Sequence, residues 1–183
     1  MRLWWPTLLL FSIGSLAQEL PATGGVPLRF AGSVSAPLNG KQLLANAAEA
    51  WRFSFGLEPG ARMELDTTAS NIVGTARFNF RSTQLNGREE TLGTISYRVR
   101  ITVLNGECRW SVEELKHTGN RAAPKGGVDI GLLTTGTSPP KRLPGMSHSA
   151  SVKLWEDAKR QVTDRVDVVR RGFEARLRLV NGQ

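Results

Sequence analysis

Two Asn-Gly pairs, Asn86-Gly87 and Asn105-Gly106, constrain the fold of this chain more than any other feature of its sequence. An Asn-Gly pair between segments of alternating apolar residues favours a two-residue hairpin turn. Such a turn fixes which residues of the two flanking strands lie opposite each other. Each pair therefore predicts a strand register that can be checked against the positions of the apolar side chains.

Both registers place apolar side chains on one common face of a sheet. The turn at Asn105-Gly106 pairs Val103 with Cys108, Ile101 with Trp110 and Val99 with Val112. The turn at Asn86-Gly87 pairs Phe78 with Ile95, Ala76 with Tyr97, Gly74 with Val99 and Ile72 with Ile101. A slip of one residue would move the apolar set of one strand to the other face. The agreement of two independent turns predicts a three-stranded antiparallel meander.

The opposite face of this meander is polar and basic. Its cationic residues are Arg77, Arg98, Arg100 and Arg109. A sheet with one apolar face is covered by other elements on that face, while the polar face meets solvent. We predict that these four arginines form a partner-binding face. A basic face that is simply solvated is the alternative interpretation.

Two amphipathic helices are expected to cover the apolar face. The first is predicted over residues 40–55, where Asn39 and Gln42 have the spacing of a capping box and Gly56 follows as a left-handed stop. The second is predicted from about 148 to 180, because apolar residues recur there at intervals of three and four.

Two further strands and a long loop complete the predicted order. Strands are expected over 27–35 and 61–66, the latter with Met63 and Leu65 facing inward. Residues 118–147 are rich in glycine and proline and form a long loop. The fold class is therefore α+β, with the order β-α-β4-α and an antiparallel sheet that carries two helices on one face.

The first residues have the pattern of a secretory signal. A positive charge at Arg2 precedes an apolar run, and the small residues Ser15 and Ala17 stand at the −3 and −1 positions of a cleavage site. The apolar run is shorter than the roughly 20 residues that cross a bilayer. We expect a signal peptide over 1–17, cleavage near Ala17, and export to the periplasm or the medium.

Composition fits one domain over 27–183 that follows a flexible leader over 18–26. The chain has 183 residues, of which 40% are hydrophobic, so it can bury a core. Cys108 is the only cysteine, so no intramolecular disulfide can form. Three tryptophans fall on apolar faces of the predicted elements and are expected in the core: Trp51, Trp110 and Trp155.

No residue pattern predicts catalytic, cofactor-binding or metal-binding residues. His117, His148 and Cys108 lack metal-ligand spacing; Cys108 is predicted to point into the core, and His117 to be solvated. The neighbours in Glu89-Glu90 and in Glu113-Glu114 point to opposite sides of a strand, which disfavours acid-base pairs. No glycine-rich phosphate-binding motif is present. We therefore expect a protein that is not an enzyme and has no cofactor.

The order and spacing of several segments resemble a known family. The segments are Ala47–Trp51, Ile72–Ala76, Ile95–Ile101, Asn105-Gly106 and Cys108–Trp110. The pattern, which extends over about 27–180, is similar to exported domains of unknown function with a TBP-like fold from Bacteroidetes. The resemblance implies the same β-α-β4-α order and carries no catalytic residue. The loop over 118–147 is longer than the usual passage to the last helix in that family.

These observations favour a non-enzymatic binding or interaction module of the bacterial cell envelope. The net charge of +8, or +7 without Arg2, would attract acidic surfaces, and the expected partner is an envelope component, an anionic glycan or a protein. Export makes nucleic acid an unexpected partner, and no transmembrane segment is expected in the mature chain. One alternative is a small-ligand carrier or enzyme with a pocket under loop 118–147, near His117 and His148. Another is a subunit that needs a partner strand or helix.

Overall fold

The computed structural model describes residues 25–104, 106–123 and 126–179. The predicted signal peptide and residues 18–24 of the leader lie outside the described residues. The strands are β1 (Phe30–Ser35), β2 (Arg62–Asp66), β3 (Asn71–Phe80), β4 (Gly93–Leu104), β5 (Glu107–Gly119) and β6 (Gly131–Leu132), and the two α-helices are α1 (Gly40–Arg52) and α2 (His148–Leu179).

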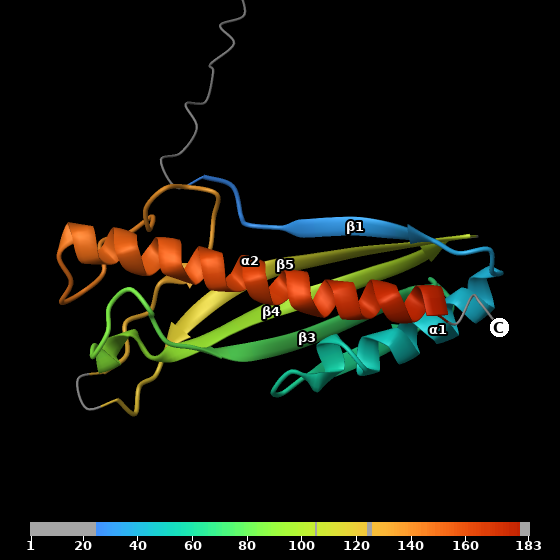
Figure 1. Cartoon of the computed structure of the whole chain (residues 1–183), viewed down its shortest axis with the longest axis horizontal. Coiled ribbons are helices and arrows are strands. Elements are labelled where there is room, and N and C mark those ends of the chain that lie inside the picture. Colours follow the sequence, from blue (N-terminus) through green and yellow to red (C-terminus); the bar gives the residue numbers. More distant parts are fainter. Residues whose placement is uncertain (1–24, 105, 124–125, 180–183) are drawn as a thin grey trace, which may run out of the picture.

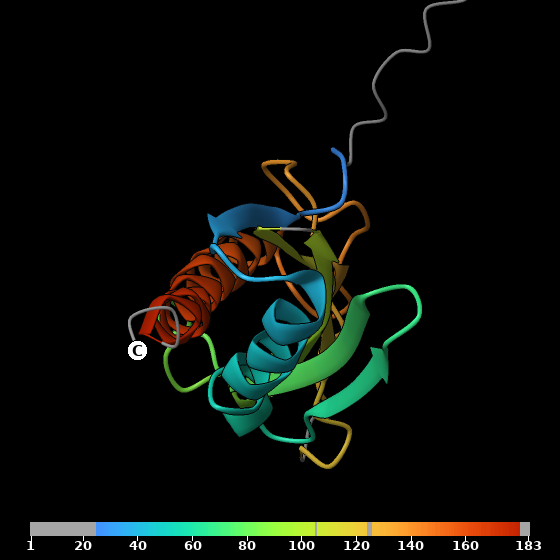
Figure 2. The ribbon, with the colours of Figure 1, turned by 90° about the vertical axis from the view of Figure 1, so that its right-hand side faces the viewer.

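One antiparallel sheet contains all six strands. Their order is β1-β5-β4-β3-β2, and β6 also pairs with β5. Both helices lie on the same side of the curved sheet (Figures 1 and 2). We call that side the inner face and the opposite side the outer face. The predicted α+β class and the β-α-β4-α order are confirmed, with β6 as an additional short strand.

Both predicted registers of the meander are confirmed. Val103 lies opposite Cys108 in β4 and β5, and Phe78 lies opposite Ile95 in β3 and β4. The prediction of a two-residue hairpin at Asn86-Gly87 is wrong, because β3 ends at Phe80 and β4 begins only at Gly93. The predicted register of β3 and β4 is nevertheless correct, because Asn86-Gly87 lies at the midpoint of the longer connection between the two strands.

A β-bulge in β5 was not foreseen. The pairing of β4 with β5 shifts register between Ser96 and Arg98, and Glu114 on β5 has a φ of 56°. Such a bulge adds one residue to one strand and reverses the faces of those that follow. Glu113 and Glu114 consequently both belong to the outer face, and His117 belongs to the inner face. The prediction that His117 is solvated is wrong, because its side chain is fully buried.

Helix α1 begins as predicted and ends earlier than predicted. The Gln42 backbone N–H donates to Asn39 Oδ1 at 2.9 Å, and Asn39 Nδ2 donates to Gln42 Oε1 at 2.8 Å, which is the capping box. The helix ends at Arg52, and Gly56 does not have the left-handed conformation of a helix stop. A short 3-10 helix over Phe55–Leu57 follows instead.

The core lies between the inner face and the two helices. The three tryptophans predicted in the core, Trp51, Trp110 and Trp155, are all buried, as is Cys108. Met63 of the edge strand β2 packs against the core, but Leu65 is 44% exposed, because this end of β2 is left uncovered.

The long loop over 118–147 packs against the core and is hydrogen bonded to the sheet through β6. It buries Ile130, Leu133 and Leu143. The backbone N–H of Thr135 also donates to the carbonyl of Val26 at 2.9 Å, so the last residue of the predicted leader is hydrogen bonded.

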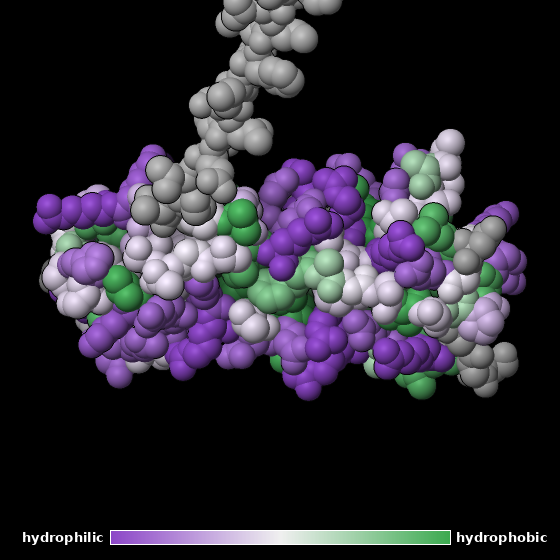
Figure 3. All heavy atoms as spheres, turned by 90° about the horizontal axis from the view of Figure 1, so that it is seen from above, coloured by the Kyte–Doolittle hydropathy of each residue, from purple (hydrophilic) through white to green (hydrophobic). Residues whose placement is uncertain are grey.

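Seen from the β1 side, the surface is mainly hydrophilic, with hydrophobic side chains in small separate areas (Figure 3). Among the described residues, neither helix combines the length and the apolar character that a membrane span requires.

Candidate functional site

The four arginines of the predicted partner-binding face lie on one face of the sheet, but they do not form one cationic surface. Arg77, Arg98, Arg100 and Arg109 all belong to the outer face of the sheet. Three of them are paired with glutamates. The pairs are Arg98–Glu114 at 2.8 Å, Arg100–Glu113 at 3.0 Å and Arg109–Glu107 at 2.8 Å.

The β-bulge explains why these arginines are paired. It turns the neighbouring residues Glu113 and Glu114 to the same face, where a regular strand would place them on opposite faces. The pairing of Arg109 with Glu107 follows from their spacing of two along β5, which also puts both on one face. The hydrogen bond from Arg109 lowers the pKa of Glu107 below its ordinary value. This part of the outer face is therefore largely neutralised.

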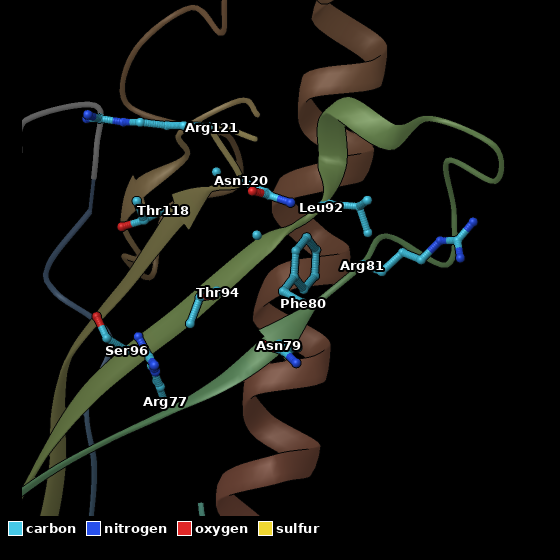
Figure 4. A pocket seen from close by; sticks show the side chains of 12 residues that line it. Arg77, Asn79, Phe80, Arg81, Leu92, Thr94, Ser96, Thr118, Asn120 and Arg121 are labelled. Carbon is cyan, nitrogen blue, oxygen red and sulfur yellow. The ribbon is translucent and has the colours of Figure 1, made fainter. Parts of the chain in front are cut away.

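Arg77 lies apart from these pairs, in a hollow of about 780 Å³ on the outer face (Figure 4). The wall of the hollow comes from β3, β4, the end of β5 and the loops that follow β3 and β5. It contains no aspartate, glutamate, histidine or cysteine. We call it the arginine hollow, and its polar side chains include Arg77, Asn79, Arg81, Thr94, Thr118 and Arg121.

Three polar side chains form a row across the floor of the arginine hollow. Asn79 lies opposite Thr94 in β3 and β4, and Thr94 lies opposite Thr118 in β4 and β5. Because the registers are fixed by the meander, the three side chains share the outer face on adjacent strands. They place hydroxyl and carboxamide groups, which both donate and accept hydrogen bonds, side by side.

Three arginines surround this row. In Figure 4, Arg81 and Arg121 lie on opposite sides of Thr94, and Arg77 lies below it. Within the described part of the chain, no carboxylate forms an ion pair with any of the three. This distinguishes them from the paired arginines of the same face.

The sequence interpretation found Arg77 but missed Arg81 and Arg121. Arg81 directly follows β3, and Arg121 follows β5 by two residues. A face assignment based on alternation ends with the strand, so it could not include them. The predicted register could have identified both residues. It places the end of β3 and the end of β5 on either side of the beginning of β4, so the residues that follow these two strands lie near each other.

The position of Arg121 is set by hydrogen bonds that hold the end of β5. The backbone N–H of Asn120 donates to the carbonyl of Leu92 at 2.8 Å, and the backbone N–H of Gly119 donates to Asp129 Oδ1 at 2.6 Å. Gly119 must remain glycine, because a Cβ there would lie 2.5 Å from the Gly127 backbone.

Beneath the hollow, His117 packs on the inner face. Its ring meets the edge of Phe80 at a centroid distance of 5.0 Å, and its Nδ1 accepts from the Ile130 N–H at 3.4 Å. Burial lowers the pKa of His117 to about 4, although the nearby Asp129 acts in the opposite direction. The imidazole is therefore neutral at pH 7 and supports the fold.

Acidification is expected to destabilise the protein through His117. Above pH 6.5, the ordinary pKa of histidine, His117 is neutral in both the folded and the unfolded protein. Between pH 6.5 and about 4, His117 takes up a proton in the unfolded chain but stays neutral in the folded protein. Stability is thus full above pH 6.5 and falls by about 3 kcal/mol towards pH 4. Denaturation of the protein and of His117→Gln at several pH values measures this. A wild-type slope between pH 6.5 and 4.5 no steeper than that of the variant would contradict the expectation.

The alternative pocket under loop 118–147 is not built around the two histidines. A hollow of about 780 Å³ lies within the loop and is lined largely by apolar residues, including Val128, Ile130 and Leu143. His117 does not line it. His148 lines a separate, smaller hollow of about 370 Å³ at the start of α2.

Cys108 does not add a reactive group to any of these sites. Its thiol is fully buried on the inner face, and burial raises its pKa to about 12. In the described part of the chain, no three His, Cys, Asp or Glu side chains come together in a way that could hold a metal ion.

No protein-family model matches the chain, and no curated protein does. Solved structures with a similar arrangement include a TBP-like protein from Parabacteroides distasonis, with 12% identity over 79% of this chain and 93% of the other and a TM-score of 0.48. A DUF4468 family protein from Bacteroides ovatus has 13% identity over 80% and 86%, with a TM-score of 0.46. An aromatase/cyclase, Zhui, from Streptomyces sp. R1128 has 12% identity over 85% and 99%, with a TM-score of 0.33. Two of these three proteins come from Bacteroidetes, and one of the two is described as TBP-like, the kind of domain that the sequence resembles.

Proposed function

We propose that this chain is a non-enzymatic binding module of the bacterial cell envelope and that it holds an acidic partner in the arginine hollow. The observation that carries the proposal is the contrast between two groups of arginines on one face. Arg98, Arg100 and Arg109 have glutamate partners, whereas Arg77, Arg81 and Arg121 have none among the described residues.

Unpaired arginines around a concave, polar surface favour an anionic ligand. A guanidinium group donates several hydrogen bonds in a planar fork, which suits carboxylate, sulfate and phosphate groups. No carboxylate of the hollow competes for these donors. The wall also has no carboxylate, histidine or cysteine that could serve as an ordinary general base for the hydroxyls of Thr94, Ser96 and Thr118, which supports binding over catalysis.

The envelope location is part of the proposal and rests on the signal-like first residues. Export would bring the basic domain, with its net charge of +8 in the full chain, next to the acidic polymers and lipids of a bacterial surface. Recovery of the protein from a periplasmic or extracellular fraction with Gln18 as its first residue would support this location.

The test compares two triple variants with the same change in charge. Arg77→Gln/Arg81→Gln/Arg121→Gln is expected to weaken binding to acidic probes by about tenfold or more, because each lost charge-assisted hydrogen bond contributes on the order of 1 kcal/mol. The probes are polyglutamate, dextran sulfate and vesicles of anionic phospholipid, measured at one ionic strength.

The matched control is Arg98→Gln/Arg100→Gln/Arg109→Gln, which removes the same charge from the same face. It is a stringent control, because it also removes the arginine partners of Glu107 and Glu114 and leaves Glu113 only its longer contact with Arg29 at 3.9 Å. We expect it to weaken binding less than the hollow variant does. Equal losses in both variants would show that only overall charge matters and would reject the proposed site.

A further inference from the structure

We infer that the arginine hollow binds a segment of an acidic polysaccharide that lies across strands β3, β4 and β5. This inference rests on the proposed function and names the class of its ligand. Three features of the hollow carry it: the row of hydrogen-bonding side chains on its floor, the separation of its arginines, and its position on the face of the sheet.

The row Asn79–Thr94–Thr118 suits a sugar better than it suits a bare anion. Adjacent strands lie about 4.8 Å apart, so the row extends over about 10 Å. No hydrogen-bond partner engages the Thr94 and Thr118 hydroxyls within the described part of the chain. A hydroxyl both donates and accepts, as the hydroxyl of a sugar does, whereas a carboxylate or sulfate only accepts. Arginines alone would suffice for a bare anion.

The arginines are placed for an extended ligand. Arg81 and Arg121 lie on opposite sides of the row, and in Figure 4 both side chains extend away from Thr94. One compact anion could not reach both guanidinium groups while it occupied the floor. A chain with an acidic group on successive units can meet Arg121 at one side and Arg81 at the other. The volume of about 780 Å³ also exceeds what a single inorganic ion requires.

The position of the hollow argues against an acidic peptide that binds by strand addition. Peptides that bind to sheets add a strand at an edge, where backbone groups are free to pair. In the arginine hollow, the backbone groups of β3, β4 and β5 are paired with one another, and the face offers mainly side chains.

The surface of the hollow argues equally against a lipid bilayer. Proteins that dock on membranes combine cations with exposed apolar side chains. The large hydrophobic residues exposed on the described part of the chain, among them Phe53, Leu57 and Val168, do not line this hollow. A flat bilayer surface would also leave the row on the floor without contacts.

The experiment compares sugar and non-sugar polyanions. Calorimetric titration uses oligogalacturonate, which carries carboxylates, dextran sulfate, which carries sulfates, polyglutamate and inorganic phosphate at the same ionic strength. At least one of the two acidic sugar chains is expected to bind about tenfold or more tightly than polyglutamate of similar charge, because its hydroxyls add several hydrogen bonds.

A second pair of variants isolates the hydroxyls. Thr94→Val/Thr118→Val keeps the β-branched shape and removes both hydroxyls, and it is expected to reduce that preference to about threefold or less while leaving polyglutamate binding unchanged. The control is Thr75→Val/Thr102→Val, which removes two hydroxyls of the same outer face outside the hollow and should keep the full preference.

The outcomes separate this inference from the proposed function. If polyglutamate or phosphate binds as tightly as both acidic sugars, or if the Thr94/Thr118 variant keeps its preference, the inference is overturned. The binding function would then stand, provided that the triple arginine variant of the hollow still loses more affinity than its control. If the two arginine variants lose affinity equally, the proposed function fails, and the inference fails with it.

Discussion

Replacement of Asp157 by alanine is expected to lower the free energy of unfolding by about 3–5 kcal/mol, because it removes the acceptor of a buried hydrogen-bond network. Asp157 lies on α2, and its carboxylate is fully buried. It accepts hydrogen bonds from Ser82 Oγ at 2.8 Å, from the Thr83 N–H at 2.6 Å and from Gln161 Nε2 at 3.2 Å, and Arg160 also donates to it. The variant leaves the buried Ser82 hydroxyl and the part-buried Thr83 N–H without this acceptor.

The protonation state of Asp157 follows from the same network. Burial by itself raises the pKa of this carboxyl, but the hydrogen bonds from Arg160, Ser82, Gln161 and Thr83 more than offset burial, and the pKa lies below its ordinary value. The charged form is therefore the one that the fold holds. Asp157→Asn should also destabilise, because an amide places donors where the network already supplies donors.

Asp167 of the same helix provides the matched control. It pairs with Arg170 and Arg171 at the surface, and such exposed pairs contribute little. We expect Asp167→Ala to change stability by less than about 1 kcal/mol. Chemical denaturation followed by tryptophan fluorescence measures both variants. A loss in Asp157→Ala no larger than in Asp167→Ala would contradict the assigned role.

Asp157 also connects the inner helix layer to the arginine hollow. It holds the segment directly after β3, where Arg81 stands, and Gln161 Nε2 donates to the Arg81 carbonyl at 3.0 Å. This connection explains why the loop after β3 is longer than the Asn86-Gly87 pair suggests. The chain leaves the sheet at Phe80 because hydrogen bonds to α2 replace the next pairs of the ladder.

The fold could be predicted because its main constraints are local. The Asn-Gly positions fix two registers, the apolar alternation selects one face, and the Asn39 cap starts α1. Each of these depends on residues that are close in sequence, and each agrees with the others.

The parts that could not be predicted depend on contacts between distant segments. The bulge at Glu114 could not be recognised from the alternation of apolar and polar residues in β5. It becomes evident only from the structure, in which Leu115 and His117 face inward. The hydrogen bonds of Asp157 join residues more than seventy positions apart. Of the four arginines named from the sequence, three have glutamate partners and only Arg77 lines the hollow, and Arg81 and Arg121 could be added only once the loops were placed.

Replacement of Trp51 by alanine is also expected to lower the free energy of unfolding by about 3–5 kcal/mol, because a large buried ring is lost. Its indole covers Gly74 of β3, where a Cβ would lie 2.7 Å from Trp51 Cζ2. An alanine normally stabilises a strand relative to glycine. Gly74→Ala should nevertheless destabilise by about 1–3 kcal/mol, because the indole has no room to move away.

A double-mutant cycle tests this contact directly. In the presence of Trp51→Leu, Gly74→Ala should lose most of its effect, because the shorter side chain leaves space for the new methyl group. Trp110 provides the control, because its indole covers Gly32 of β1 and not Gly74. The effects of Trp110→Leu and Gly74→Ala should add. Additive effects in the Trp51 cycle, or strong coupling in the Trp110 cycle, would contradict this explanation. The contact with the Trp51 indole would then not be the reason why position 74 of β3 requires glycine.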